Sequence, residues 1–131
     1  MKAIIFLLLA FCNYVFAAQQ EPLPLDECKT QAPLGFPISK SEHSIQICRK
    51  AYLSTFNTDK KIPEVVFYVL TPEHALGCLG RSNKFAADKS LEDSPKPKDY
   101  AKSGYDMGHM MNDADSRWDL QVEEDSFILS N

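Results

Sequence analysis

The sequence predicts an α+β fold, an antiparallel sheet with a flanking helix. Two observations carry this prediction. The run Val65-Val66-Phe67-Tyr68-Val69-Leu70 is β-branched and aromatic, which is typical of a buried strand, and apolar residues after Ser116 recur with helical spacing. The chain has only 5 glycines and no glycine-rich phosphate loop, so common nucleotide-binding loops are excluded.

Residues 1–17 are predicted to be a secretory signal peptide. Lys2 precedes an apolar run, Ala3 to Phe11, that is too short to span a bilayer, and the small residue Ala17 suits signal peptidase. An uncleaved anchor and, more weakly, a lipoprotein remain alternatives. We therefore expect a secreted or periplasmic protein with no membrane attachment after cleavage.

Removal of the leader leaves 114 residues, enough for one domain with a modest core. The chain has 14 basic and 18 acidic side chains, and loss of Lys2 moves its formal charge from −4 to −5. This balance argues against a protein that holds polyanions through its overall field. Any contact with nucleic acid must be local and strongly salt-sensitive.

Three cysteines follow the leader, and their spacing matches no zinc site. Because exported proteins keep disulfides, we expect Cys28 to pair with Cys48, closing a loop of roughly 20 residues for about 3 kcal/mol in the chain-entropy model. Cys78 is then either a free buried thiol or a cysteine whose partner is missing. Around this pair, residues 18–44 are rich in Pro and Gln and are expected to be extended, with little regular structure.

A β-hairpin is expected to follow. Its first strand lies within 45–56, its turn at 57–61 and its second strand at 65–70, buried on both faces. The second strand ends at Pro72, which cannot donate to a ladder. His74 in the next turn is interpreted as a polar loop residue, with a ligand role as the alternative.

Residues 78–100 form an irregular connection that contains Arg81, and such long connections are usually functional or disordered. A helix is expected from about Ser116, after a run of capping residues. Four carboxylates on it are expected on its solvated face, with a metal cluster as the alternative. They are Asp119, Glu123, Glu124 and Asp125.

His109 is the best candidate for a general base, because imidazole titrates near neutrality. It follows Gly108 in a segment, 104–111, that is otherwise expected to be a buried strand; a purely structural role is the alternative. Gly108 permits close approach of a ligand, and Asp106 can orient a ring or satisfy local amides. Arg81 carries the guanidinium suited to a phosphate or its transition state.

These residues carry a family resemblance. Asp106-Met107-Gly108-His109 resembles the Asp-Arg-Gly-His signature of the DNA/RNA non-specific endonucleases, nucleases of the ββα-metal (His-Me finger) fold. Arg81 to Asp88 resembles the family's Arg-x-x-x-aromatic-x-x-Asp segment, and Phe127 to Asn131 resembles the start of its next conserved block. The resemblance runs from about residue 48 to 131, so we expect a partial nuclease domain at 45–131. Met107 departs from the signature arginine.

The resemblance implies a secreted endonuclease that hydrolyses the phosphodiester bonds of both DNA and RNA. His109 would activate water, Arg81 would bind phosphate or its transition state, Asp106 would contact substrate, and Asn131 would support the catalytic site. A single Mg²⁺ or Mn²⁺ is implied, and it needs few protein contacts. The principal asparagine ligand is expected beyond Asn131, so no metal ligand is assigned within the chain.

The expected position of that ligand suggests the N-terminal part of a nuclease domain, from a truncated gene or an incomplete record. One alternative is therefore a non-catalytic, secreted nucleic-acid-binding or decoy module. Another is a small disulfide-stabilised protein with no nucleic-acid role. Truncation would leave Trp118, Phe127 and Ile128 uncovered, which predicts marginal stability. Nucleic acid is the expected partner, and a homodimer is left open.

Overall fold

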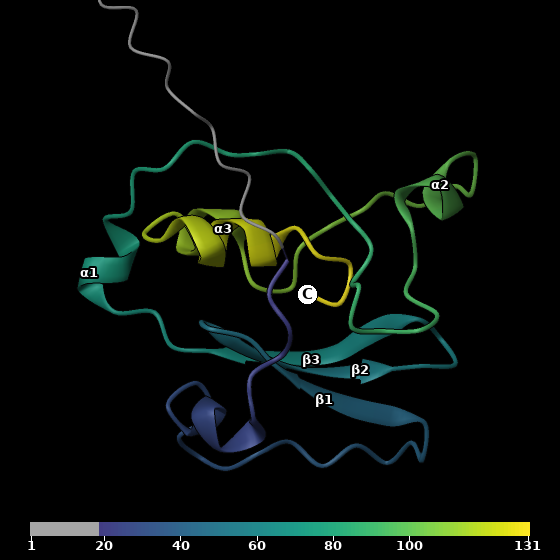
Figure 1. The fold of residues 1–131 in the computed structure, drawn as a ribbon, viewed down its shortest axis with the longest axis horizontal. Coiled ribbons are helices and arrows are strands. Elements are labelled where there is room, and N and C mark those ends of the chain that lie inside the picture. Colours follow the sequence, from purple (N-terminus) through teal and green to yellow (C-terminus); the bar gives the residue numbers. More distant parts are fainter. Residues whose placement is uncertain (1–18) are drawn as a thin grey trace, which may run out of the picture.

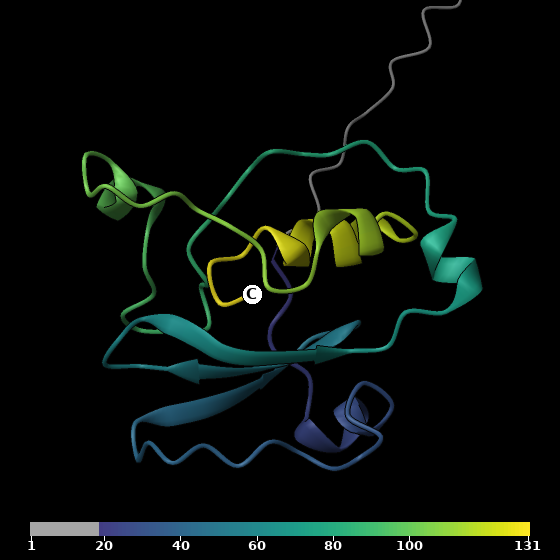
Figure 2. The same cartoon turned by 180° about the vertical axis from the view of Figure 1, so that it is seen from behind.

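A computed structural model describes residues 19–131 as an α+β fold, which confirms the predicted class. One antiparallel sheet has the strand order β1 (Ser44–Cys48), β2 (Tyr52–Asn57), β3 (Ile62–Tyr68). The helical elements are η1 (Leu25–Lys29), α1 (Pro72–Ala75), α2 (Pro97–Tyr100), η2 (Asp113–Asp115) and α3 (Leu120–Ser126). Helix α3 covers one face of the sheet and η1 lies on the other (Figure 1; Figure 2). The expected signal peptide, 1–17, lies outside the described residues.

The stretch 45–56 forms two strands, so the prediction of a single first strand is wrong. The polar pair Arg49-Lys50 interrupts the apolar pattern, and the Arg49 N–H donates to the Tyr52 carbonyl at 2.8 Å to close a tight turn. The predicted hairpin is therefore a three-stranded meander with a second turn between Asn57 and Ile62.

The central strand β2 is buried along its whole length, whereas β3 is only partly buried. The prediction that the 65–70 strand is buried on both faces is therefore wrong. It lies at the sheet edge and ends at Tyr68, and Ile62 at its start is 47% exposed. A β-branched run predicts a strand but not which neighbours that strand will have.

The disulfide between Cys28 and Cys48 is present, as predicted, and ties η1 to β1. Both cysteines pack with Ala32 and Leu53 in a core cluster on one side of the sheet. The N-terminal segment thus contains one short 3-10 helix and covers a sheet face. Cys78 is exposed, so the prediction of a buried free thiol is wrong.

The second core cluster joins the sheet to α3 through Tyr52, Met111 and Val122. Helix α3 begins at Leu120, four residues later than predicted, because the Asp119 side chain caps it by accepting from the N–H groups of Gln121 and Val122. Within residues 19–131, no helix is both long and apolar enough to cross a membrane.

Phe127 and Ile128 are buried, so the prediction that they stay uncovered is wrong. The chain's own 78–100 connection covers them. Ala86 N–H donates to Phe127 O at 3.0 Å, and Leu129 N–H donates to Ala86 O at 2.9 Å. Trp118 is half-buried and stacks on His74 with ring centroids 3.9 Å apart.

The predicted solvated face of α3 is wrong for two of its four carboxylates, since Glu123 and Asp125 are both buried. Glu123 Oε1 accepts from the backbone N–H of Ser82 at 2.7 Å, and Asp125 accepts from the Gln121 side chain at 2.8 Å. Glu123 is buried because the 78–100 connection passes over the helix, which the helical pattern alone does not reveal.

Candidate active site

His109 lies in an irregular and mostly exposed segment, so the predicted buried strand at 104–111 is wrong. The histidine itself is partly buried. Its ring meets Phe127 nearly edge-on at a centroid distance of 4.5 Å and Phe85 at 4.9 Å. Phe85 and Phe127 are 5.0 Å apart, so the two phenyl rings form an aromatic wall that fixes the imidazole.

Asn131 holds the chain two residues beyond His109. Its Oδ1 accepts from Met111 N–H at 2.8 Å, and its Nδ2 donates to the carbonyls of Met111 and Ser126 at 3.1 and 2.7 Å. Its side chain is buried and occupied by backbone groups. Asn131 therefore holds the backbone at Met111, two residues after His109, through these hydrogen bonds.

Arg81 lies against the same aromatic wall as His109. Its guanidinium carbon is 5.1 Å from the centroid of Phe127, and its Nη1 donates to Asp113 Oδ2 at 3.2 Å. Its side chain remains 41% exposed. The structure thus brings Arg81 and His109 together on Phe127, with the guanidinium still open to solvent on one side.

Asp113 and Arg117 are two functional candidates that the sequence reasoning did not single out. Arg117 donates to the same Oδ2 of Asp113 that receives Arg81. The chain brings Arg117 here because Gly77 packs directly on the backbone of Arg117 and Trp118, leaving no room for a Cβ. The i,i+4 spacing of Asp113 and Arg117 is the sequence signal that could have found this pair.

Two polar atoms of this cluster are buried and lack a hydrogen-bond partner within residues 19–131: His109 Nε2 and Asp113 Oδ1. A buried polar atom without a partner costs about 1–3 kcal/mol, and native proteins carry few of them. Their occurrence together in one cluster makes this cluster a candidate ligand site.

The pKa of His109 is held below its ordinary value. Burial is the main cause, and the positive charge of Arg81 adds to it, while the Asp113 carboxylate opposes both. At neutral pH the imidazole is therefore uncharged and carries a nitrogen lone pair. This is the protonation state that a general base needs.

Asp106 does not join this cluster. It is exposed and lines a separate groove beside α2, three residues before His109. Its substrate-binding role remains a prediction.

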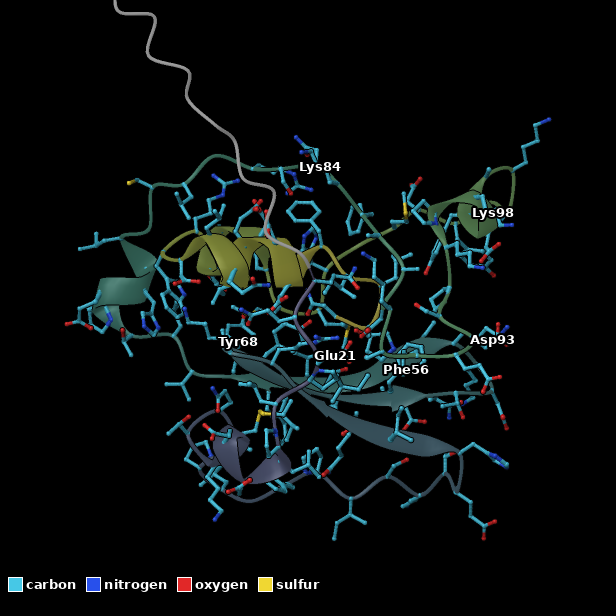
Figure 3. All side chains as sticks on the ribbon, viewed as in Figure 1. Glu21, Phe56, Tyr68, Lys84, Asp93 and Lys98 are labelled. Atoms are coloured by element: carbon cyan, nitrogen blue, oxygen red, sulfur yellow. A yellow bond between two sulfur atoms is a disulfide. The ribbon has the colours of Figure 1, made fainter. Side chains whose placement is uncertain are left out.

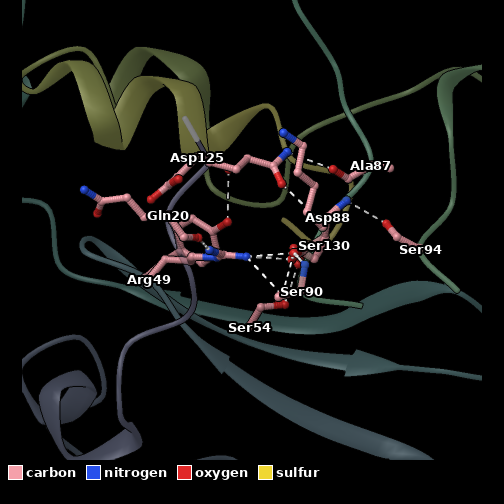
Figure 4. A network of polar contacts seen from close by, with 12 residues as sticks. Gln20, Arg49, Ser54, Ala87, Asp88, Ser90, Ser94, Asp125 and Ser130 are labelled. Carbon is pink, nitrogen blue, oxygen red and sulfur yellow. Dashed lines mark hydrogen bonds and ion pairs between the residues drawn. The ribbon is translucent and has the colours of Figure 1, made fainter. Parts of the chain in front are cut away.

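Asp88, the other end of the Arg81 to Asp88 segment, lies in a buried network (Figure 4). Arg49 Nη2 donates to both of its oxygens, at 2.8 and 2.9 Å, and the Ser130 hydroxyl donates to Oδ2. Burial by itself raises the pKa of Asp88, but the hydrogen bonds from Ser130 and Ser90 and the charge of Arg49 outweigh it and lower that pKa. Asp88 is thus a structural anchor.

No group of three or more His, Cys, Asp or Glu side chains suited to a metal ion occurs in residues 19–131. Asp113 Oδ1 is one unpaired but buried oxygen of the kind that Mg²⁺ prefers, and the Asn131 oxygen is already occupied by Met111. One carboxylate oxygen does not fix an ion. The described residues alone therefore do not complete a metal site.

A family model for DNA/RNA non-specific endonucleases matches residues 30–131. A mitochondrial nuclease of Saccharomyces cerevisiae is 34% identical over 101 residues, which cover 74% of this chain and 30% of that protein. The matched part therefore spans less than a third of that relative's length. The chain belongs to the DNA/RNA non-specific endonuclease family. Members of this family act on nucleic acids and generally use a divalent metal ion.

Proposed function

We propose that this protein is a secreted, metal-dependent endonuclease that hydrolyses phosphodiester bonds in both DNA and RNA. The observation that carries the proposal is that His109, whose buried Nε2 has no partner in the described chain, packs on the same Phe127 ring as the half-exposed guanidinium of Arg81. Family membership adds that the substrate is nucleic acid.

In the proposed reaction, His109 removes a proton from a water molecule whose oxygen bonds to phosphorus. The bond from phosphorus to the leaving oxygen of the strand breaks, and that oxygen takes a proton from solvent. Arg81 donates to the phosphate oxygens, on which negative charge develops. Phe85 and Phe127 keep the imidazole in place during proton transfer.

We further propose that a single divalent ion, Mg²⁺ or Mn²⁺, is required. When bound, such an ion supplies positive charge at the scissile phosphate. The support is the family's general use of a divalent ion, since the described residues do not form a complete ligand set.

A secreted or periplasmic location is also proposed. The buried Cys28–Cys48 disulfide supports it, because disulfides persist in oxidising compartments. N-terminal sequencing of protein from the culture medium is expected to begin at residue 18 or 19. A cytosolic product that retains residues 1–17 would overturn this proposal. Analytical ultracentrifugation of the same sample measures the mass of the protein in solution and so tests whether it forms a homodimer.

A non-catalytic nucleic-acid-binding module is the second candidate, favoured by the incomplete metal site among the described residues. Plasmid DNA and a long RNA, each incubated with the protein in Mg²⁺ or in EDTA, separate the two candidates. We expect cleavage of both nucleic acids in Mg²⁺ and none in EDTA. Binding of both without any cleavage would support the binding module instead.

The variant His109→Ala is expected to lower cleavage by about 10²-fold or more. His43→Ala is the matched control, because His43 is an exposed histidine just before β1 whose Nδ1 lies 3.6 Å from Asp59 Oδ1. It should cleave like wild type. Equal loss in both variants, with intact unfolding transitions, would contradict the assignment of His109.

A further inference from the structure

A groove of about 860 Å³ lies between the β2–β3 turn and the loop that carries α2. Figure 3 labels Lys98 and Asp93 at this end of the molecule, away from α1. Four lysines and two tyrosines are among its lining residues: Lys60, Lys61, Lys96, Lys98, Tyr100 and Tyr105. This concentration of lysines contrasts with the chain's net charge of −4.

Three carboxylates, Asp93, Asp99 and Asp106, also line the groove, so its four lysines exceed them by one. Asp93 pairs with Lys61 Nζ at 2.5 Å, and Asp99 accepts from the backbone N–H of Lys96 at 2.8 Å. Lys96 and Lys98 form no ion pair with any residue from 19 to 131. The ammonium group of Lys98 is therefore available to an anionic ligand. The Lys61 hydrogen bond and charge lower the pKa of the Asp93 carboxyl, and the charge of Lys96 adds to this, but Lys96 is not held in an ion pair.

Tyr105 gives the groove a second kind of contact. Its side chain is 78% exposed, although a tyrosine buries apolar area readily. Lysines that neutralise phosphates beside an exposed aromatic ring are the combination that binds single-stranded nucleic acid, because each base offers a face for stacking.

We propose that this groove holds an unpaired nucleic-acid strand next to the point of cleavage. Lys96 and Lys98 contact its phosphates and Tyr105 stacks on one base. The inference rests on the proposed nuclease function and adds to it a preference for unpaired strands, since a base must leave its stack to meet Tyr105.

The reach of the chain fits this arrangement. Asp106 lines the groove and is three residues from His109, so the two Cα atoms lie at most about 11 Å apart. A stacked strand, as in a duplex, rises about 3.4 Å per nucleotide, and an unpaired strand is at least as extended. A strand cut at His109 therefore enters the groove within about three nucleotides, which favours an oligonucleotide over a mononucleotide.

Fluorescence anisotropy of a labelled 12-nucleotide single strand, with the full chain in EDTA to prevent cleavage, tests the proposal. Lys96→Ala/Lys98→Ala should weaken binding about 10-fold and flatten the dependence of log affinity on log salt by about 1.4, at about 0.7 per lost phosphate contact. Tyr105→Ala should weaken binding at least about fivefold and leave the salt slope unchanged.

Lys29→Ala/Lys40→Ala removes two exposed lysines outside the groove, in η1 and in the 30–43 loop, and is the matched control. It should bind like wild type. A heparin dodecasaccharide separates charge from stacking: Tyr105→Ala should not change its affinity, because heparin has no bases.

Three results would overturn the proposal: no binding by wild type, equal loss in both lysine pairs, or equal loss of heparin and DNA affinity in Tyr105→Ala. Undiminished cleavage by His109→Ala would refute the nuclease assignment, and the anisotropy results would still decide the groove independently.

Discussion

Two arginine–carboxylate pairs in this protein use the same chemical groups to different ends. Asp88 and Asp113 are both almost fully buried. Both oxygens of Asp88 accept hydrogen bonds, and its partner Arg49 is only 2% exposed. In Asp113, one oxygen accepts hydrogen bonds from both Arg81 and Arg117, and the other has no hydrogen-bond partner. The side chain of Arg81 is 41% exposed. A closed pair anchors the fold, whereas a half-open pair can present a guanidinium to a ligand.

The two pairs lie at opposite ends of one segment. Arg81 begins it and Asp88 ends it, and Ala86 between them pairs with the backbone of Phe127 and Leu129. The Arg49–Asp88 network (Figure 4) therefore fixes the position of the segment 81–88, whose other end places Arg81 next to His109. The structural pair positions the functional one.

The largest expected effect is on the closed pair. Asp88→Ala leaves the Arg49 charge buried with its main partner removed, so the free energy of unfolding should fall by about 3–5 kcal/mol, measured by urea denaturation. Lys50→Ala, which breaks a partly exposed pair with Asp119, should cost at most about 1 kcal/mol. If Asp113→Ala costs as much as Asp88→Ala, the contrast between the two pairs fails.

Arg81→Ala tests the open pair. Loss of a donor to the developing negative charge should lower the cleavage rate by about 10²- to 10³-fold. The free energy of unfolding should change by less than about 1 kcal/mol, because the guanidinium is partly exposed. Wild-type cleavage in this variant, or a loss of activity that merely follows unfolding, would refute the assignment.

Asp125 is another buried carboxylate, and it has no hydrogen bond from an arginine. Burial raises its pKa to about 6 from 3.8, although the Gln121 hydrogen bond and the charge of Arg49 oppose the shift. Because the folded pKa is the higher one, this contribution to stability is full below pH 3.8 and is lost as pH rises through 6.

Asp125→Asn keeps an oxygen acceptor for Gln121 Nε2 and removes the charge. Relative to wild type, its free energy of unfolding should change little at pH 4 and rise by on the order of 2 kcal/mol at pH 7.5. Urea denaturation at both pH values measures the difference. An equal gain in the free energy of unfolding at pH 4 and at pH 7.5 would show that burial does not raise the pKa of Asp125.

The smallest effect is expected in Asp113→Asn, which keeps an oxygen for Arg81. The Asp113 carboxylate raises the pKa of His109, so its removal should lower that pKa further. The acid limb of kcat/KM against pH should then move to lower pH. A shift to higher pH would show that Asp113 does not act on the histidine through its charge.

The sequence predicted those parts of the site that depend on residue order. His109 and Arg81 were predicted because they belong to an ordered series of motifs. The disulfide was predicted because few cysteines remain after the leader and one pair closes a favourable loop. The role of Asp113 could not be predicted, because its contact with Arg81 joins residues 32 positions apart in the sequence.

The wrong predictions share one physical origin, which is packing between distant segments. The apolar run 65–70 indicates a strand, but the turn at Arg49-Lys50 makes β2 the central one. The helical pattern places Glu123 on the solvated face, but the backbone N–H of Ser82 lies over it and donates to its side chain. The sequence predicts an uncovered Phe127, but the rings of Phe85 and His109 pack on it. None of these contacts can be predicted from local sequence patterns, because each joins residues that are far apart in the chain.

Rescue of His109→Ala by imidazole is the most direct test of the central claim, that the neutral imidazole of His109 removes the proton from water. Plasmid nicking in Mg²⁺ should be slow in this variant and should rise with imidazole concentration, more steeply at pH values where imidazole is uncharged. Wild type should show no such increase. Wild-type nicking by the variant without imidazole, or the same acceleration of both proteins, would contradict the claim.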